Sequence, residues 1–127
     1  MKLQLTVPAG STSTGLLSFT GYGNGYVLVN GARHNSNLIV TPDHLLGWDV
    51  AGFDALTEAH FAQLAGFAPE VALLGTGTTQ RFPHPRLVAP LARARIGLEV
   101  MDTHAACRTY NILFAESRRV LAALLIS

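Results

Sequence analysis

The fold is decided by residues 70–126, which read EVALLGTGTTQRFPHPRLVAPLARARIGLEVMDTHAACRTYNILFAESRRVLAALLI. Apolar runs of strand length alternate here with helical patterns. The pattern predicts strands at 70–74, 97–101 and 118–126, and helices at 85–95 and from 103 to about 115. Short connections between these elements require parallel strands joined by right-handed crossovers. The C-terminal half is therefore predicted to be a parallel βαβαβ unit with helices covering its sheet.

The preceding half of the chain carries the signals of an antiparallel meander. Its β-prone segments are 16–20, 26–29, 32–34 and 38–41. Asn24-Gly25 and Asn30-Gly31 are hairpin turn signals, because both dipeptides favour the positive φ angles of tight turns. Pro42 ends the run of strands. The N-terminal half is predicted to be a small twisted antiparallel sheet.

A helix is predicted between the two halves, at 57–65. Apolar residues recur there at spacings of three and four, and Gly66 ends the pattern. The whole reads as an α/β fold with a single mixed sheet, antiparallel in its N-terminal part and parallel in its C-terminal part. We expect one domain over 1–127, with 1–13 as a mobile N-terminal segment.

Composition narrows the class of protein. The 127 residues are 49% hydrophobic and 13% charged, which is typical of a folded domain. Nine Lys and Arg stand against eight Asp and Glu, with no basic stripe, so we expect no nucleic-acid partner. No apolar run approaches the length of a membrane span, and the N-terminus does not read as a signal peptide. Cys107 is the single cysteine, which excludes an internal disulfide and favours a cytoplasmic location.

The loop Gly75-Thr76-Gly77-Thr78-Thr79-Gln80-Arg81 is the first candidate site. It follows a predicted strand at its carboxyl end, where ligands of open α/β sheets bind, and small residues let backbone N–H groups approach an anion. Arg81 could add a charge-assisted contact. The loop lacks the third glycine of the dinucleotide fingerprint and the Gly-Lys-Ser/Thr of the P-loop. A plain structural turn is therefore the alternative.

The start of the helix predicted from 103 is the second candidate. Cys107 lies near its first turn beside Arg108, where the helix dipole favours a thiolate. The alternative is a packed thiol, because free cysteine commonly behaves as a small core residue. His104, Arg108 and Asn111 share one helix face, which either looks into a cleft or forms a hydrated surface in which Asn111 satisfies a neighbouring backbone group.

Together these two segments predict a ligand pocket between residues 75–81 and 103–111. The candidate ligand-binding residues are Gly75, Thr76, Gly77, Thr78, Arg81, Thr103, Cys107, Arg108 and Asn111. The five histidines show neither His-x-His nor His-Glu-x-x-His spacing, so we expect no metal site. No catalytic residue and no cofactor is predicted, and we expect that the protein is not an enzyme.

An ordered set of motifs resembles a known family. The motifs are Leu73-Leu74-Gly75-Thr76-Gly77, Arg81-Phe82-Pro83, Glu99-Val100-Met101-Asp102-Thr103, Ala105-Ala106-Cys107-Arg108-Thr109-Tyr110-Asn111 and Arg118-Arg119-Val120. They resemble a family of uncharacterised bacterial and archaeal proteins that includes mitochondrial complex I assembly factor 3. The resemblance covers residues 14–126 and implies a three-layer α/β domain with a smaller β element beside its main sheet. His104 stands where many relatives have a small residue.

The resemblance implies no reaction, and the mitochondrial member acts in assembly with a partner and in association with a membrane. Two functions are therefore predicted. The first is a non-enzymatic interaction domain that assists assembly of a respiratory or other membrane complex, using apolar surface from the meander or from Trp48 and Phe53. It would bind a protein partner or a membrane-complex subunit without being an integral membrane protein. The second is a small-ligand or anion-binding domain that uses the pocket above. The sequence gives no oligomeric state.

Overall fold

A computed structural model describes residues 15–126. The segment 1–13, expected to be mobile, lies outside the described residues. The strands are β1 (Phe19–Gly23), β2 (Tyr26–Val29), β3 (Ala32–His34), β4 (Leu38–Thr41), β5 (His44–Gly47), β6 (Val71–Thr76), β7 (Gly97–Met101) and β8 (Val120–Leu125). The helices are α1 (Glu58–Ala65), α2 (Ala89–Arg93) and α3 (Thr103–Ala115), with a 3₁₀ turn, η1 (Phe53–Ala55), ahead of α1.

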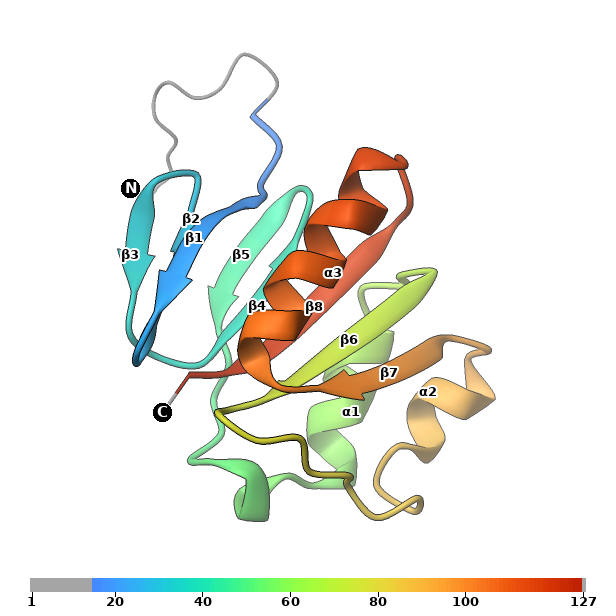
Figure 1. The fold of residues 1–127 in the computed structure, drawn as a ribbon. Helices are drawn as coiled ribbons and strands as arrows, with labels where there is room; N and C mark the ends of the chain where they lie inside the picture. Colours follow the sequence, from blue (N-terminus) through green and yellow to red (C-terminus); the bar gives the residue numbers. More distant parts are fainter. Residues whose placement is uncertain (1–14, 127) are drawn as a thin grey trace.

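The predicted parallel half is confirmed. The five-stranded sheet has the order β5-β4-β8-β6-β7, in which β6 is parallel to both β7 and β8. Helices α2 and α3 provide the two crossovers (Figure 1). Strand β8 lies between β4 and β6 and is antiparallel to β4, so it joins the N-terminal half to the parallel unit.

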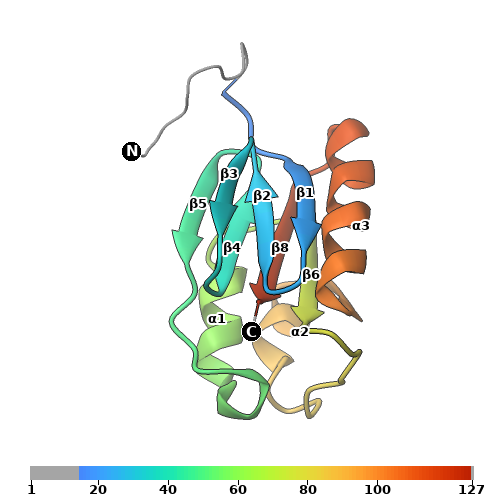
Figure 2. The same ribbon diagram turned by 60° about the vertical axis from the view of Figure 1, so that its left-hand side comes forward.

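The antiparallel meander is also confirmed, but the expectation of one continuous sheet is wrong. Strands β1, β2 and β3 form a separate three-stranded sheet, while β4 pairs with β8 (Figure 2). Both predicted turns are present, and Asn30 and Gly31 adopt positive φ angles of 48° and 84°. Asn30 also fastens the turn to the start of β1, because its Oδ1 accepts from the Ser18 amide at 2.9 Å. The small sheet forms from hairpins between strands that are neighbours in the sequence. Strand β4 pairs instead with β8, which is longer and fully buried.

Several element boundaries differ from the sequence predictions, and one strand was not predicted. The helix expected at 85–95 is confined to α2 (Ala89–Arg93), preceded by turns, because the prolines at 85 and 90 withhold amide donors and fit only the first turn of a helix. Strand β1 begins at Phe19, and the chain before it is held by the Leu17 amide, which donates to Pro42 O at 2.8 Å. Strand β5 was not predicted, because it is short and follows a proline turn.

Successive side chains of the central strands point to opposite faces of the sheet, so the core consists of two clusters. Along β8, Val120, Ala122 and Leu124 face α3 and the small sheet, whereas Leu121, Ala123 and Leu125 face the side of α1 and α2. These side chains are all at most 2% exposed, as both faces of a parallel sheet are covered. The molecule therefore has three layers: α3 with the small sheet, the five-stranded sheet, and α1 with α2.

Candidate functional site

Gly75, which was predicted to bind a ligand, lies in β6 and allows this strand to pack closely against β8 and the start of α3. A Cβ atom on Gly75 would lie 2.9 Å from Leu124 Cδ2 and 3.0 Å from the backbone Cα of Thr103. Thr103 is 5% exposed, and its hydroxyl donates to Leu125 O at 2.7 Å and accepts from the Gly77 amide at 2.8 Å. The Thr103 amide in turn donates to Gly77 O at 2.9 Å. The carboxyl ends of β6 and β8 are thus tied to the start of α3 by one threonine.

The loop after β6 is closed by its own hydrogen bonds. The Thr76 hydroxyl donates to Thr79 O at 2.6 Å and accepts from the Arg81 amide at 3.1 Å. The side chain of Gln80 donates to Val100 O on β7 at 2.9 Å. Arg81 pairs with Asp54 of η1 at 3.0 Å, which draws its guanidinium toward η1. The loop is therefore a fixed turn over the end of the sheet.

The polar face of α3 holds the small sheet. His104 Nε2 donates to Gly23 O at 2.9 Å, and its ring is stacked on Tyr22 with centroids 4.4 Å apart. Arg108 Nη1 donates to the Tyr22 hydroxyl at 2.7 Å. This hydrogen bond is the first cause of a raised Arg108 pKa. The shared face predicted for His104, Arg108 and Asn111 exists, and it contacts β1.

Asn111 completes this contact through the backbone of Phe19. Its Oδ1 accepts from the Phe19 amide at 3.0 Å and its Nδ2 donates to Phe19 O at 2.7 Å. Asn111 satisfies a backbone group, as one alternative expected, but the face to which it belongs packs on β1 and is not a hydrated surface. Residues 92 positions apart in the chain are joined by two hydrogen bonds. Asn111 therefore substitutes for a paired strand at the edge of β1.

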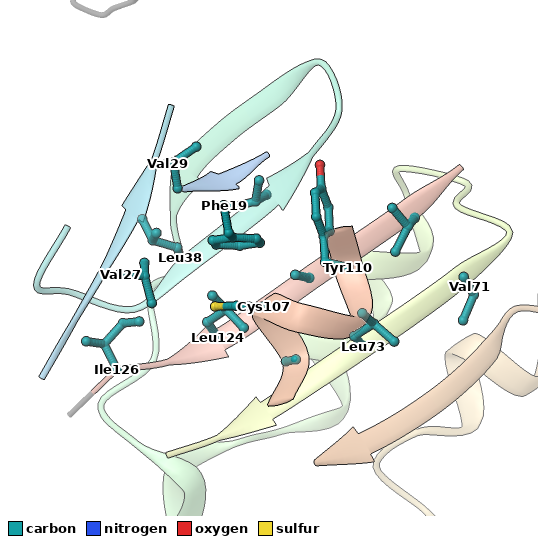
Figure 3. Close-up of a cluster of buried hydrophobic side chains, with 14 residues drawn as sticks. Phe19, Val27, Val29, Leu38, Val71, Leu73, Cys107, Tyr110, Leu124 and Ile126 are labelled. Atoms are coloured by element: carbon teal, nitrogen blue, oxygen red, sulfur yellow. The ribbon is translucent and has the colours of Figure 1, made fainter. Parts of the chain in front are cut away.

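Cys107 is packed in the core between α3 and the small sheet (Figure 3). The residue is 1% exposed, and burial raises the pKa of its thiol to about 12. The expectation of a packed thiol is confirmed. Tyr110, one turn further along α3, directs its hydroxyl to Leu17 O at 2.8 Å, and burial raises its pKa as well. Desolvation extends the pH range in which both side chains stay protonated upward from their ordinary pKa values.

A cavity of about 120 Å³ lies between the loop after β6, the start of α3 and the turn of the β1-β2 hairpin. Its lining is Gly23, Asn24, Gly25, Tyr26, Gly77, Thr78, Asp102, Thr103, His104 and Ile126. Of the nine predicted ligand-binding residues, it brings together Gly77, Thr78 and Thr103. Gly75, Thr76, Arg81, Cys107, Arg108 and Asn111 lie outside the lining, in the contacts given above. The sequence predicted the turn at Asn24-Gly25 but not that this turn faces the start of α3 and lines the cavity.

The acid at the head of α3 gives the cavity one fixed charge. Asp102 is the N-cap of the helix, and its carboxylate accepts from the Ala105 amide at 2.9 Å. The cavity is smaller than the usual range of sites for drug-sized ligands, which is about 300–1,000 Å³. Only a small ligand or ion would fit without movement of the hairpin.

A second, open groove of about 370 Å³ lies beside the end of β5. It is lined by Ser36, Asn37, Gly47, Trp48, Asp49 and Val50. Asn37 organises it, since its Nδ2 donates to Val50 O at 2.9 Å and its Oδ1 accepts from the Ile126 amide at 2.7 Å. Trp48 is 3% exposed, so the expectation that it offers apolar surface is wrong. It packs with Leu56 and Phe61 in the core under α1.

No group of three or more His, Cys, Asp or Glu side chains within residues 15–126 could hold a metal ion. No helix in the same range is long and apolar enough to cross a bilayer.

Solved structures show the same architecture. A crystal structure of a protein from Bordetella parapertussis is 43% identical, matches 91% of this chain and 100% of its own, and superposes with a TM-score of 0.85. The solution structure of a Bordetella pertussis protein described as a Mth938-like domain is 38% identical over 99% of this chain and 92% of its own, with a TM-score of 0.78. The fold is therefore shared with Mth938-like proteins.

A curated relative has a described role. NADH dehydrogenase [ubiquinone] 1 alpha subcomplex assembly factor 3 of Drosophila melanogaster is 30% identical over 98% of this chain and 65% of its own length. This chain thus spans a little under two thirds of that protein. Residues 19–125 match the family described as "Protein of unknown function (DUF498/DUF598)". The resemblance drawn from the motifs is confirmed, and the chain belongs to the DUF498/DUF598 family.

Proposed function

We propose that this protein is a non-enzymatic interaction domain that assists assembly of a respiratory or other membrane complex. The observation that carries the proposal is the similarity to assembly factor 3 of Drosophila melanogaster over 98% of this chain. Because the chain spans 65% of that relative, the partner and the complex are part of the proposal. A cytoplasmic location is proposed with it, and fractionation of cells tests that location directly.

The chemistry of the polar residues supports this function. Thr76, Thr103 and Asn111 use their hydrogen-bonding groups to hold loops and strands of the fold. Cys107 is a buried thiol with a raised pKa, which is the opposite of an activated nucleophile. These side chains hold the interior of the fold together, and the proposal assigns the activity of the protein to its surface.

Cross-linking in living cells tests the proposal. The full chain is tagged, expressed at its normal level and purified under denaturing conditions after cross-linking, and attached proteins are identified by mass spectrometry. We expect subunits of one membrane complex. Deletion of the gene should lower the assembled fraction of that complex on native gels while its subunits are still made. Unchanged assembly, with no membrane-complex subunit attached, would contradict the proposal.

A second function that we propose is the binding of a small ligand or anion; the cavity supports a small ligand, whereas the Asp102 carboxylate in its lining opposes an anion. Three of the nine predicted ligand-binding residues, Gly77, Thr78 and Thr103, line this cavity and support the proposal. Labelled protein is titrated with phosphate, nucleotides and small carboxylates while backbone amide shifts are followed by NMR. Saturable shifts confined to residues 23–26, 77–78 and 102–104 would establish the ligand site. No shifts in that panel would leave the interaction domain as the function of the chain.

A further inference from the structure

Phe82 is an aromatic side chain exposed to solvent on the loop after β6. Its exposed fraction, 71%, is larger than that of each of the other exposed large apolar residues in 15–126, which are Leu16, Tyr22, Leu45 and Ile112. The motif Arg81-Phe82-Pro83 that contains it has no role in the cavity. Aromatic side chains exposed in this way are enriched at the centres of protein interfaces.

The loop that carries Phe82 is held in place on both sides. Before it, the Arg81 amide donates to the Thr76 hydroxyl, and the Arg81 guanidinium lies 4.2 Å from the ring centre of Phe53 and 3.0 Å from an Asp54 oxygen. After it, the His84 ring accepts from the Arg86 amide at 3.0 Å. Pro83 and Pro85 fix two φ angles between these contacts. A side chain presented from such a loop loses little conformational entropy on binding.

The charge around Phe82 is positive. Residues 71–98 contain four arginines and neither aspartate nor glutamate. Arg81 and Arg93 pair with Asp54 and Glu58 across the gap to η1 and α1. Arg86, four positions after Phe82, forms no ion pair within residues 15–126. The segment between β6 and α2, which carries Arg81 and Arg86, runs beside η1 (Figures 1 and 2).

We propose that Phe82, flanked by Arg81 and Arg86, is the docking surface for a partner protein that carries an apolar pocket bordered by carboxylates. The inference rests on the proposed interaction function and deepens it. The apolar pocket buries the exposed ring of Phe82, and the carboxylates complement the unpaired charge of Arg86 and the outer edge of the Arg81 guanidinium. Complementary charge of this kind speeds association and excludes basic partners.

The first experiment places a photo-reactive group at the surface. In the full chain and in living cells, Phe82 is replaced by p-benzoyl-phenylalanine, and in a matched control Ile112 of α3, which is 60% exposed, is replaced instead. We expect position 82 to cross-link to a protein segment that carries apolar residues flanked by Asp or Glu. Cross-links from 82 only to lipid, or to a neutral or basic segment, would overturn the inference. Partner cross-links from position 112 alone would overturn it but leave the proposed function standing, and no protein attached at either position would remove both.

The second experiment measures the affinity of the full chain for the partner found in this way. We expect Phe82→Ala to weaken binding about 30-fold or more, as for a central aromatic residue of an interface. Arg86→Glu should weaken it about tenfold at low salt and less at high salt, because an exposed charge is screened. Ile112→Ala should leave affinity unchanged. Amide spectra confirm folding, and wild-type affinity in the folded Phe82→Ala variant would overturn the inference.

Discussion

Asn111 on α3 satisfies both the amide and the carbonyl of Phe19 on β1, through hydrogen bonds of 3.0 and 2.7 Å. This side chain therefore takes the place of a neighbouring strand at that point of the small sheet. It contributes two hydrogen bonds between α3 and β1, and it lies beside the edge-to-face contact of Phe19 with Tyr110, whose ring centres are 5.0 Å apart.

Replacing Asn111 by Ala should destabilise the fold by about 1–3 kcal/mol, because two partly buried backbone groups lose their partner. Urea unfolding measures the change, and Ile112→Ala on the exposed side of the same helix is the control. Hydrogen exchange at the Phe19 amide should become faster in Asn111→Ala alone. Equal stability of the two variants would show that the pair contributes nothing to the fold.

Replacing Gly75 by Ala should cost about 1–3 kcal/mol, the usual range for overpacking in a well-filled interior. The added methyl group would meet Leu124 Cδ2 at 2.9 Å and the Thr103 backbone at 3.0 Å, and backbone cannot rotate away. Gly97→Ala, in β7 of the same sheet, is the matched control because nothing lies within 4 Å of its Cβ position. Gly97→Ala should be neutral or slightly stabilising, because Ala loses less backbone entropy than Gly in a strand. A midpoint of urea unfolding that falls for both variants alike would contradict the packing explanation.

Thr103→Val should also destabilise the protein, by about 1–3 kcal/mol for each buried group left unpaired. Its hydroxyl joins the Gly77 amide to Leu125 O, whereas Thr78 is exposed. Thermal and urea unfolding of Thr103→Val and Thr78→Val compare the two positions. If the hydroxyl ties the loop to α3, amide shifts at Gly77 should change in Thr103→Val, and an unaltered Gly77 signal would contradict this reading.

The Cys107 thiol should react only after unfolding. Its pKa of about 12 keeps the thiol protonated in the folded state, while the unfolded thiol ionises near its ordinary pKa of about 8.5. The unfolded state therefore loses a proton first as pH rises, so stability falls between these two pKa values, by at most about 1.4 kcal/mol per pH unit. An aromatic disulfide reagent should label the native protein at pH 8 far more slowly than the denatured protein.

Cys107→Ala provides the control for the pH dependence. The difference in unfolding free energy between wild type and Cys107→Ala should shrink above pH 9, because the variant lacks the titrating thiol. Unfolding measured at pH 7, 9 and 10 tests this. A constant difference, or rapid labelling of the native protein, would show that the thiol is accessible to solvent.

The parts that the sequence predicted well are those decided by periodicity. Strand β8 is predictable because an apolar run of this length, following a capped helix with Asp102 at its head, has one local interpretation. The hairpin at Asn30-Gly31 is equally local, since its positive φ angles need those residue types. The helix predicted at 85–95 is longer than the observed helix at 89–93. Helix propensity around Pro90 does not indicate where the preceding turns end and the helix begins.

The rest depends on contacts between distant residues. That β4 leaves the meander for β8 is decided by pairing between residues more than 80 positions apart. The residue types at the candidate site were plausible for a pocket, yet Arg108 and Asn111 are directed at β1 and Arg81 at η1. The direction of a side chain on a helix face depends on the element that packs against that face. The local sequence does not indicate that the hairpin turn at 24–25 lies close to the start of α3.

The central position of β8 has a consequence for synthesis on the ribosome. Translation proceeds from the N-terminus, so β4 and β6 are both made before the strand that separates them in the sheet. Until residues 120–125 have emerged, each of these apolar strands has one open edge, and the first half of the chain cannot be joined to the second. Non-local pairing of this kind slows folding and exposes strands to other chains. The five-stranded sheet therefore cannot be completed until β8 has been inserted between β4 and β6.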